Sequence, residues 1–191
     1  MKSYSVDLTK SVHLIPWKLK ILRLIWSALV WPVASRLPFR FGSTIRVFFL
    51  RLFGSKVGHS CLIQPGVKIL IPSNLSLSDY VAIGKFVEIY NFAPVVIESM
   101  TVISQYSFIC TGTHDYTHPD FPLTSAPIKI GSECWLAASV MVLPGISIGD
   151  GAVIGARSLV SKTMPPWMIC GGNPCKVIKP RKISFSQDIK I

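Results

Sequence analysis

The sequence IGSECWLAASVMVLPGISIGDGAVIGARSLVSK, residues 130–162, repeats with a period of six. When every sixth residue is counted from Ile130, the residue that follows each counted position is mostly small, as in Gly131, Ala137 and Gly149. A period of six fits neither the 3.6-residue turn of a helix nor the alternation of a single strand. The stretch therefore consists of hexapeptide repeats. An aliphatic residue begins each one: Ile130, Leu136, Val142, Ile148, Ile154 and Val160.

A coil with a triangular cross-section satisfies this period, because each hexad then supplies one flat strand and one corner. The aliphatic side chain points inward and stacks on its counterpart one coil later, and the small residue lets the chain turn. Such a solenoid buries its core only by stacking several coils. An ordinary β-sandwich with evenly spaced turns is the alternative, and six consecutive matches disfavour it. We therefore predict an all-β solenoid, a parallel β-helix.

The same pattern begins well before residue 130. Three hexads form one coil of about 18 residues, so the chain has room for roughly five coils. We predict a β-helix over residues 57–165 and a C-terminal tail over residues 166–191. The earlier repeating positions fall in three registers: Val57, Ile63 and Ile69; Leu77, Ile83, Ile89 and Val95; Ile97, Ile103 and Ile109.

Residues 1–56 differ from the rest in composition. They contain ten Lys or Arg and one acid, Asp7, in a chain whose formal net charge is +11. The longest charge-free run, residues 24–35, is shorter than the ~20 apolar residues that span a bilayer. We predict a basic amphipathic helical segment here. Its apolar stripe recurs at helical spacing: Trp17, Ile21, Leu24, Ala28 and Trp31.

Two roles suit this helical segment. Helices rich in Trp and Phe with neighbouring Lys and Arg bind anionic membrane surfaces, which predicts peripheral membrane association. Alternatively, the helices cap the open end of the β-helix or pack between subunits, because an exposed coil end needs a cover. The two roles are compatible. Binding to nucleic acid is disfavoured, since no nucleic-acid-binding motif accompanies the charge.

The five cysteines form no CxxC pair. Cys134 occupies a hexad position that needs a small side chain. We therefore expect reduced, packed thiols without a catalytic role and a cytoplasmic protein, acting at the inner face of the membrane if the helices bind lipid. The N-terminal apolar stretch lacks a small-residue cleavage site typical of a signal peptide.

The hexads fail in one place. The stretch TGTHDYTHPDFP, Thr111–Pro122, is polar, aromatic and punctuated by proline. We predict that residues 111–127 leave the solenoid as a loop, and loops on a rigid scaffold commonly carry function.

This predicted loop holds His114 and His118. A histidine can accept a proton from a hydroxyl near neutral pH, because its unperturbed pKa is about 6.5. Asp115 or a backbone carbonyl would fix the tautomer of His114. The loop is therefore the candidate site for general-base chemistry.

Three segments carry a resemblance to a known family: CTGTHDY (Cys110–Tyr116), the run Ile128–Lys162 and PPWMICGGNPCKVIK (Pro165–Lys179). Together with the repeats, they closely resemble the hexapeptide-repeat O-acetyltransferases, which include the maltose and galactoside acetyltransferases. With the basic, Trp-rich N-terminal segment, the chain looks most like the colanic acid biosynthesis acetyltransferases of exopolysaccharide assembly.

The resemblance implies left-handed β-helices assembled as a homotrimer, with active sites in the clefts between subunits. It implies direct transfer of acetyl from acetyl-CoA to a sugar hydroxyl, with no metal and no covalent acyl-enzyme. The family's general base falls on His114 and a family asparagine that contacts the acceptor falls on Asn91; Asp115 is expected on the acceptor side. The family's CoA-binding positions fall on Trp135, Ala138, Ala156, Ser161, Lys162, Lys176 and Lys179.

These residue types suit the implied roles. Small side chains at Ala138 and Ala156 would let the narrow pantetheine arm lie against the coil, and lysines bring positive charge to the CoA phosphates. Lys176 and Lys179 stand where the family often has arginine, and this exchange forgoes bidentate phosphate contacts.

Two other functions fit the fold. A γ-type carbonic anhydrase would bind a metal with three histidines, here His114, His118 and either His59 or His13. A non-catalytic scaffold would keep the fold without turnover, and the loop histidine disfavours it. For the acetyltransferase, we expect a sugar or lipid-linked saccharide as acceptor, because a lipid-linked sugar would explain basic interfacial helices.

Overall fold

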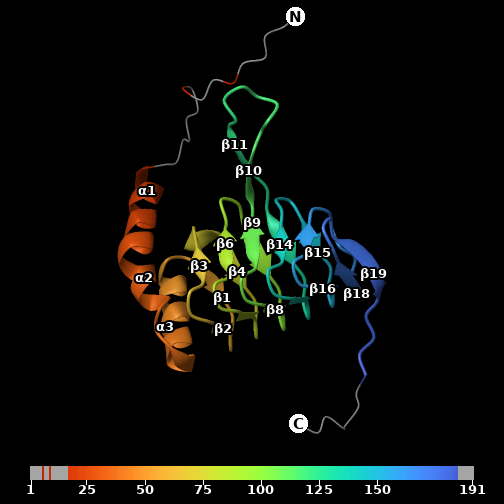
Figure 1. Ribbon diagram of the computed structural model, residues 1–191. Helices are drawn as coiled ribbons and strands as arrows, with labels where there is room; N and C mark the ends of the chain where they lie inside the picture. Colours follow the sequence, from red (N-terminus) through yellow and green to blue (C-terminus); the bar gives the residue numbers. More distant parts are fainter. Residues whose placement is uncertain (1–5, 7–8, 10–16, 185–191) are drawn as a thin grey trace, which may run out of the picture.

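A helical cap precedes a β-helix in the computed structural model, which describes residues 6, 9 and 17–184 (Figure 1). The predicted helical segment and solenoid are both present. The cap consists of α1 (Trp17–Leu24), a π-helical turn (Ile25–Val30), α2 (Trp31–Ala34) and α3 (Phe39–Leu52).

Three parallel sheets form the faces of the β-helix. The first sheet contains β1 (Lys56–Val57), β4 (Leu75–Leu77), β7 (Val95–Ile97), β12 (Ile128–Ile130) and β15 (Ser147–Ile148). The second contains β2 (Leu62–Ile63), β5 (Ala82–Ile83), β8 (Val102–Ile103), β13 (Trp135–Leu136), β16 (Val153–Ile154), β18 (Met168–Gly171) and, antiparallel at its edge, β19 (Lys176–Pro180). The third contains β3 (Lys68–Ile69), β6 (Glu88–Tyr90), β9 (Phe108–Cys110), β14 (Met141–Val142) and β17 (Leu159–Val160).

The aliphatic hexad positions form the core, as predicted. In the second sheet, Ile63 pairs with Ile83, which pairs with Ile103. Leu136 and Ile154 continue this ladder, and all five side chains are completely buried. Each strand therefore presents its aliphatic residue to the interior, and stacking of like residues excludes water along the whole axis.

The coils are longer at the start than the sequence predicted. Val57 pairs with Leu77 and Leu77 with Ile97, which gives 20 residues a coil, whereas Ile130 pairs with Ile148 after 18. Five full coils are followed by β18, which pairs with β16. The predicted tail, residues 166–191, therefore contributes two strands, β18 and β19, to the second sheet.

The extra residues gather at one corner, between the third sheet and the first sheet of the next coil. We call it the loop corner; it comprises residues 70–74, 91–94 and 111–127. A 3₁₀ turn, Pro72–Asn74, occupies the first of these segments. The third is the predicted excursion, which projects from the β-helix as a hairpin (Figure 1).

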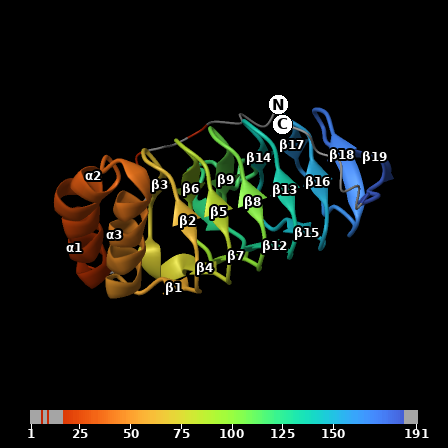
Figure 2. The same cartoon turned by 90° about the horizontal axis from the view of Figure 1, so that it is seen from below.

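The cap covers the open edge of the first coil (Figure 2). Each strand there exposes backbone groups that no earlier coil can pair, and side chains of the cap bind them. The indole N–H groups of Trp26 and Trp31 donate to the carbonyls of Ile69 and Val67, both at 2.7 Å. The third sheet is thereby closed by tryptophan.

Arginine and serine close the other two sheets. Arg46 Nε donates to the Ile63 carbonyl at 2.8 Å, and Ser43 Oγ accepts from the Ile63 N–H at 2.9 Å. Arg51 Nη2 donates to the carbonyls of Val57 and Gly58 at 2.8 and 2.9 Å. The capping role proposed for the helical segment is therefore present in the structure.

The buried face of the first helices differs from the predicted stripe. Trp26 and Trp31 face the core and stack with ring centroids 4.5 Å apart, whereas Trp17, Leu24 and Ala28 are exposed. The π-helical turn explains the difference, because its wider turn brings residues five apart onto one face. A stripe traced at 3.6 residues a turn therefore does not identify the residues on the buried face.

The five cysteines are free, and four of them are buried. Burial raises the pKa of the Cys134 thiol, which keeps it protonated and unreactive. The expectation of packed thiols without disulfides holds.

We predict that Ser43→Ala destabilises the protein, because the buried Ile63 N–H loses its acceptor. The free energy of unfolding should fall by about 1–3 kcal/mol, the cost of one unsatisfied buried group. Thr44→Ala is the matched control, since Thr44 is exposed on the same helix. Chemical denaturation of both variants checks the difference; equal stabilities would contradict the edge-capping role.

Candidate functional site

The candidate site lies on the hairpin that leaves the loop corner. Strands β10 (Gly112–His114) and β11 (Leu123–Ser125) pair antiparallel, with His114 opposite Leu123. Gly112 at the base lets the hairpin pack against Phe92, because an added Cβ would lie 2.9 Å from its ring and the ring would have to shift. The hairpin therefore holds His114 at its stem.

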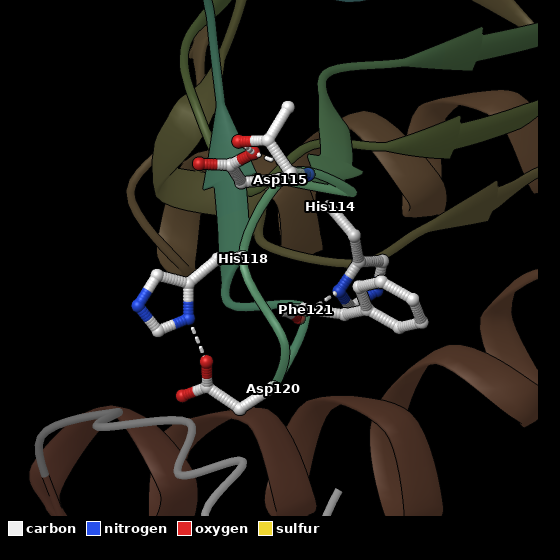
Figure 3. A network of polar contacts seen from close by, with 6 residues as sticks. His114, Asp115, His118, Asp120 and Phe121 are labelled. Carbon is white, nitrogen blue, oxygen red and sulfur yellow. Dashed lines mark hydrogen bonds and ion pairs between the residues drawn. The ribbon is translucent and has the colours of Figure 1, made fainter. Parts of the chain in front are cut away.

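His114 is exposed, and its tautomer is set by the hairpin (Figure 3). The ring Nδ1 lies 2.6 Å from the carbonyl oxygen of Phe121. A carbonyl can only accept a hydrogen bond, so Nδ1 carries the proton in the neutral ring. The lone pair is then on Nε2, the arrangement that a general base requires.

Asp115 does not orient His114. Its Oδ1 accepts hydrogen bonds from the N–H and the hydroxyl of Thr117, at 2.9 and 2.6 Å, and the two side chains point apart (Figure 3). The Thr117 hydroxyl and N–H lower the pKa of the Asp115 carboxyl, so it is ionised at neutral pH. Of the two candidates for fixing the tautomer, the structure selects the backbone carbonyl.

His118 has a different partner. Its Nδ1 contacts Oδ1 of Asp120 towards the tip of the hairpin (Figure 3). The two histidines of the loop therefore have separate environments, and one does not orient the other.

Asn91 is completely buried at the loop corner, where it holds the backbone. Its Oδ1 accepts from the N–H of Ile71 at 2.9 Å, and its Nδ2 donates to the carbonyl of Ile71 at 2.7 Å. Both polar atoms of the Asn91 side chain are therefore used within this chain, and the expected contact with an acceptor sugar stays a prediction.

The positions predicted to bind CoA lie on other parts of the β-helix. Ala138 and Ala156 stack at the corner between the second and third sheets, which we call the short corner, and the Arg157 N–H donates to the Ala138 carbonyl at 2.9 Å. Trp135 is exposed on β13, where its indole N–H donates to Ser104 Oγ at 3.0 Å.

The predicted lysines form two groups. Lys162 is exposed and follows Ser161 directly after β17, on the side of the loop corner. Lys176 and Lys179 are exposed on β19, which pairs with β18. All three ammonium groups are therefore open to a ligand.

One chain does not gather these residues into a single pocket. His114 follows the end of β9, whereas Ala138 and Ala156 precede β14 and β17, at the opposite edge of the third sheet. A site that uses both edges requires a second chain.

The sequence indicated a backbone carbonyl as a possible partner of His114 but not that it belongs to Phe121. A backbone group has no residue signature, and it reaches His114 only because β10 and β11 pair across the hairpin. The sole hint in the sequence was the loop itself, whose prolines force the chain to reverse.

The described residues contain no group of three His, Cys, Asp or Glu side chains that could hold a metal ion. His59 lies between β1 and β2 in the first coil, at another corner and two coils before the hairpin that bears His114 and His118. His13 lies outside the described residues. The three-histidine site of the carbonic anhydrase alternative is therefore not found in this part of the chain.

Comparisons with known proteins agree with the fold. Residues 127–162 match the family described as bacterial transferase hexapeptide (six repeats). The "Putative colanic acid biosynthesis acetyltransferase WcaF" of Escherichia coli K12 is 48% identical over 136 residues, which are 71% of this chain and 75% of the relative.

Solved structures share the architecture. A galactoside acetyltransferase in complex with coenzyme A has a TM-score of 0.79 at 24% identity, covering 98% of this chain and 99% of that one. The maltose O-acetyltransferase of Clostridium difficile 630 has a TM-score of 0.73 at 24% identity, covering 87% and 86%. At this identity, the likeness concerns the fold.

The repeats and sheets define a hexapeptide transferase, and the repeats imply that the β-helix is left-handed. Within that class, the chain belongs to the hexapeptide-repeat acetyltransferase family. The resemblance seen in the sequence is thereby confirmed, and the protein is an enzyme that transfers acetyl groups.

We predict that Asn91→Asp lowers the free energy of unfolding by at least about 2 kcal/mol. The substitution keeps the volume but replaces the buried donor to the Ile71 carbonyl with an oxygen. The exposed Asn173→Asp is the matched control. Denaturant titration measures the change. A variant of unaltered stability with a raised KM for the acceptor would instead support the substrate-binding role.

Proposed function

We propose that the protein is an acetyl-CoA-dependent O-acetyltransferase that acetylates a sugar hydroxyl in exopolysaccharide biosynthesis. The observation that carries this proposal is the hydrogen bond from His114 Nδ1 to the Phe121 carbonyl, because it presents Nε2 as a base. Family membership and the name of the Escherichia coli relative support the reaction and the pathway. Structural neighbours in complex with coenzyme A and acetyl-CoA support the donor.

The mechanism is direct transfer. The acceptor hydroxyl gives its proton to His114 Nε2 as its oxygen attacks the thioester carbonyl, and a backbone N–H stabilises the oxyanion. Collapse of the tetrahedral intermediate breaks the carbon–sulfur bond, and the imidazolium returns the proton to the leaving CoA thiolate. The Phe121 carbonyl stabilises the imidazolium in between, because it accepts from the other nitrogen.

The donor lies along the short corner. Small side chains at Ala138 and Ala156 leave room for the pantetheine arm, and exposed Trp135 offers an apolar face beside it. The β19 lysines bind the phosphates, since ammonium groups pair with phosphate oxygens without a fixed direction. Lys162 and the neighbouring Ser161 lie on the loop-corner side, so they reach the phosphates from the second subunit of the cleft. The β19 lysines are Lys176 and Lys179.

Opposite edges of the third sheet carry the base and the donor positions, so we propose a homotrimer with one active site in each cleft. One subunit supplies His114, and its neighbour supplies Ala138 and Ala156. The β-helix supports this arrangement, because it presents each edge of the sheet to the outside along its full length.

The acceptor binds beside the hairpin. Both hydrogen bonds from Thr117 end on Oδ1 of Asp115, which leaves Oδ2 to accept from a sugar hydroxyl. We propose a saccharide carried on a lipid as the acceptor. A non-catalytic scaffold would lack the base geometry described above and is the weaker alternative.

We predict that His114→Ala reduces kcat for acetyl transfer by about 10²–10⁴-fold, the usual contribution of a general base. His118→Ala is the matched control, because it removes a histidine of the same hairpin with a separate partner, Asp120. Thiol release from acetyl-CoA in the presence of candidate saccharides measures the rate. Wild-type transfer by His114→Ala would contradict the assignment.

We predict that Lys162→Ala weakens acetyl-CoA binding by about tenfold, since one phosphate contact is lost. Lys129→Ala is the matched control, because Lys129 lies on the first sheet and pairs with Glu98 at 3.6 Å. Calorimetric titration measures both dissociation constants, with bound metal assayed in the same sample. Absence of any CoA binding would favour the scaffold, and stoichiometric metal would favour the anhydrase.

A further inference from the structure

Helix α3 is apolar on the side turned away from the β-helix. Phe41, Phe48 and Leu52 are 75%, 61% and 65% exposed, and half-buried Ile45 completes a stripe at spacings of four, three and four. A surface helix ordinarily turns a polar face to water. Here the opposite side already faces the core through Leu50, so both sides of the helix are apolar.

The helices before α3 bear a second exposed stripe. Leu22, Ile25, Leu29 and Val33 follow one another at spacings of three, four and four, and Leu29 and Val33 are 68% and 65% exposed. Helix α2 packs against α3, so the two stripes belong to one cap. Each stripe gathers more exposed apolar side chains than the single, scattered ones found on most protein surfaces.

The charges on the cap itself have one sign. Residues 8–78 contain no Asp or Glu, and Lys20, Arg36 and Arg40 are exposed on the cap. Lys20 and Arg36 also line a groove of about 770 Å³ between the cap and the third sheet, with Trp26 and Trp31 in its wall and one acid, Glu88 of β6, on the side of the sheet. A partner that fits this surface is both apolar and anionic.

Three kinds of partner can be weighed on these grounds. A second copy of the cap would bring one basic surface against another, which is repulsive. A nucleic acid would satisfy the charges and leave Phe41, Phe48 and Leu29 in water. An anionic bilayer satisfies both, because phosphates lie at the surface and acyl chains directly beneath. No helix of the described residues is long and apolar enough to cross the bilayer.

We propose that the outer side of the cap is a membrane-docking surface specific for anionic phospholipid. The apolar stripes of α3 and of the preceding helices enter the boundary between headgroups and acyl chains, while Lys20, Arg36 and Arg40 bind the phosphates. The cap lies at the end of the β-helix opposite β18 and β19 (Figure 2), so docking leaves the coils in water. This inference uses the cap alone and does not depend on the proposed acetyl transfer.

The test is flotation of the full-length protein with phosphatidylcholine vesicles that contain, or lack, about 30 mol% phosphatidylglycerol. The wild type should float with the anionic vesicles alone, and added salt should weaken this binding. Phe41→Gln/Phe48→Gln/Leu52→Gln should reduce partitioning into the vesicles by at least about 100-fold, because less apolar surface then leaves water on docking. Lys20→Gln/Arg40→Gln should reduce it on the order of tenfold or more.

The control is Tyr80→Gln/Met100→Gln, which removes two exposed apolar side chains from the coils and should float like the wild type. Melting curves verify folding, and the charge variant keeps the test informative if the triple variant unfolds. A wild type that stays in solution, or equal binding by wild type and both cap variants, would overturn the proposal. The proposal would also be overturned if the wild type did not bind vesicles and the triple variant changed its oligomeric state. The surface would then be an interface between subunits.

Discussion

Every coil of this protein depends on the coil before it, and the first coil has none. In a parallel β-helix, the backbone N–H and C=O groups of each strand are paired by the neighbouring strands, so an open end leaves a row of polar groups at the edge of an apolar core. The cap resolves this with side chains: tryptophans on the third sheet, arginine and serine on the second, and arginine on the first.

This constraint explains much of the unusual composition of the N-terminal segment. Most of the edge groups that the cap binds are carbonyls, which need donors, and Trp and Arg donate without accepting. A carboxylate at these positions would place another hydrogen-bond acceptor against the carbonyls and could not donate to them. Capping with a buried arginine has an energetic cost, which Arg46 shows. Burial lowers its pKa, and its Nη2 is the one buried side-chain polar atom without a partner in the described residues. Part of the positive charge is therefore structural.

How much the sequence predicts follows from the same geometry. The period of six fixes which side chains point inward, and the ladder from Ile63 to Ile154 is as expected because one residue type repeats in one environment. The buried face of the first helices was not predictable at 3.6 residues a turn, since a π-helical turn leaves no mark in the hydrophobic pattern. At the site, the sequence predicts His114 as a candidate from its residue type. The contact with the Phe121 carbonyl and the hydrogen bonds of buried Asn91 depend on backbone geometry, which the sequence does not show.

The loop corner shows how such a fold accommodates function. Ile97 pairs directly with Ile130, although 32 residues separate them along the chain. The hairpin can leave and return here because a corner contributes no strand, so the stacking of the sheets on either side is unchanged. Asn91, one coil earlier, braces the same corner by binding both backbone groups of Ile71. The rigid coil thus gives the hairpin a fixed base, and the side chains that the hairpin presents can vary while the core stays the same.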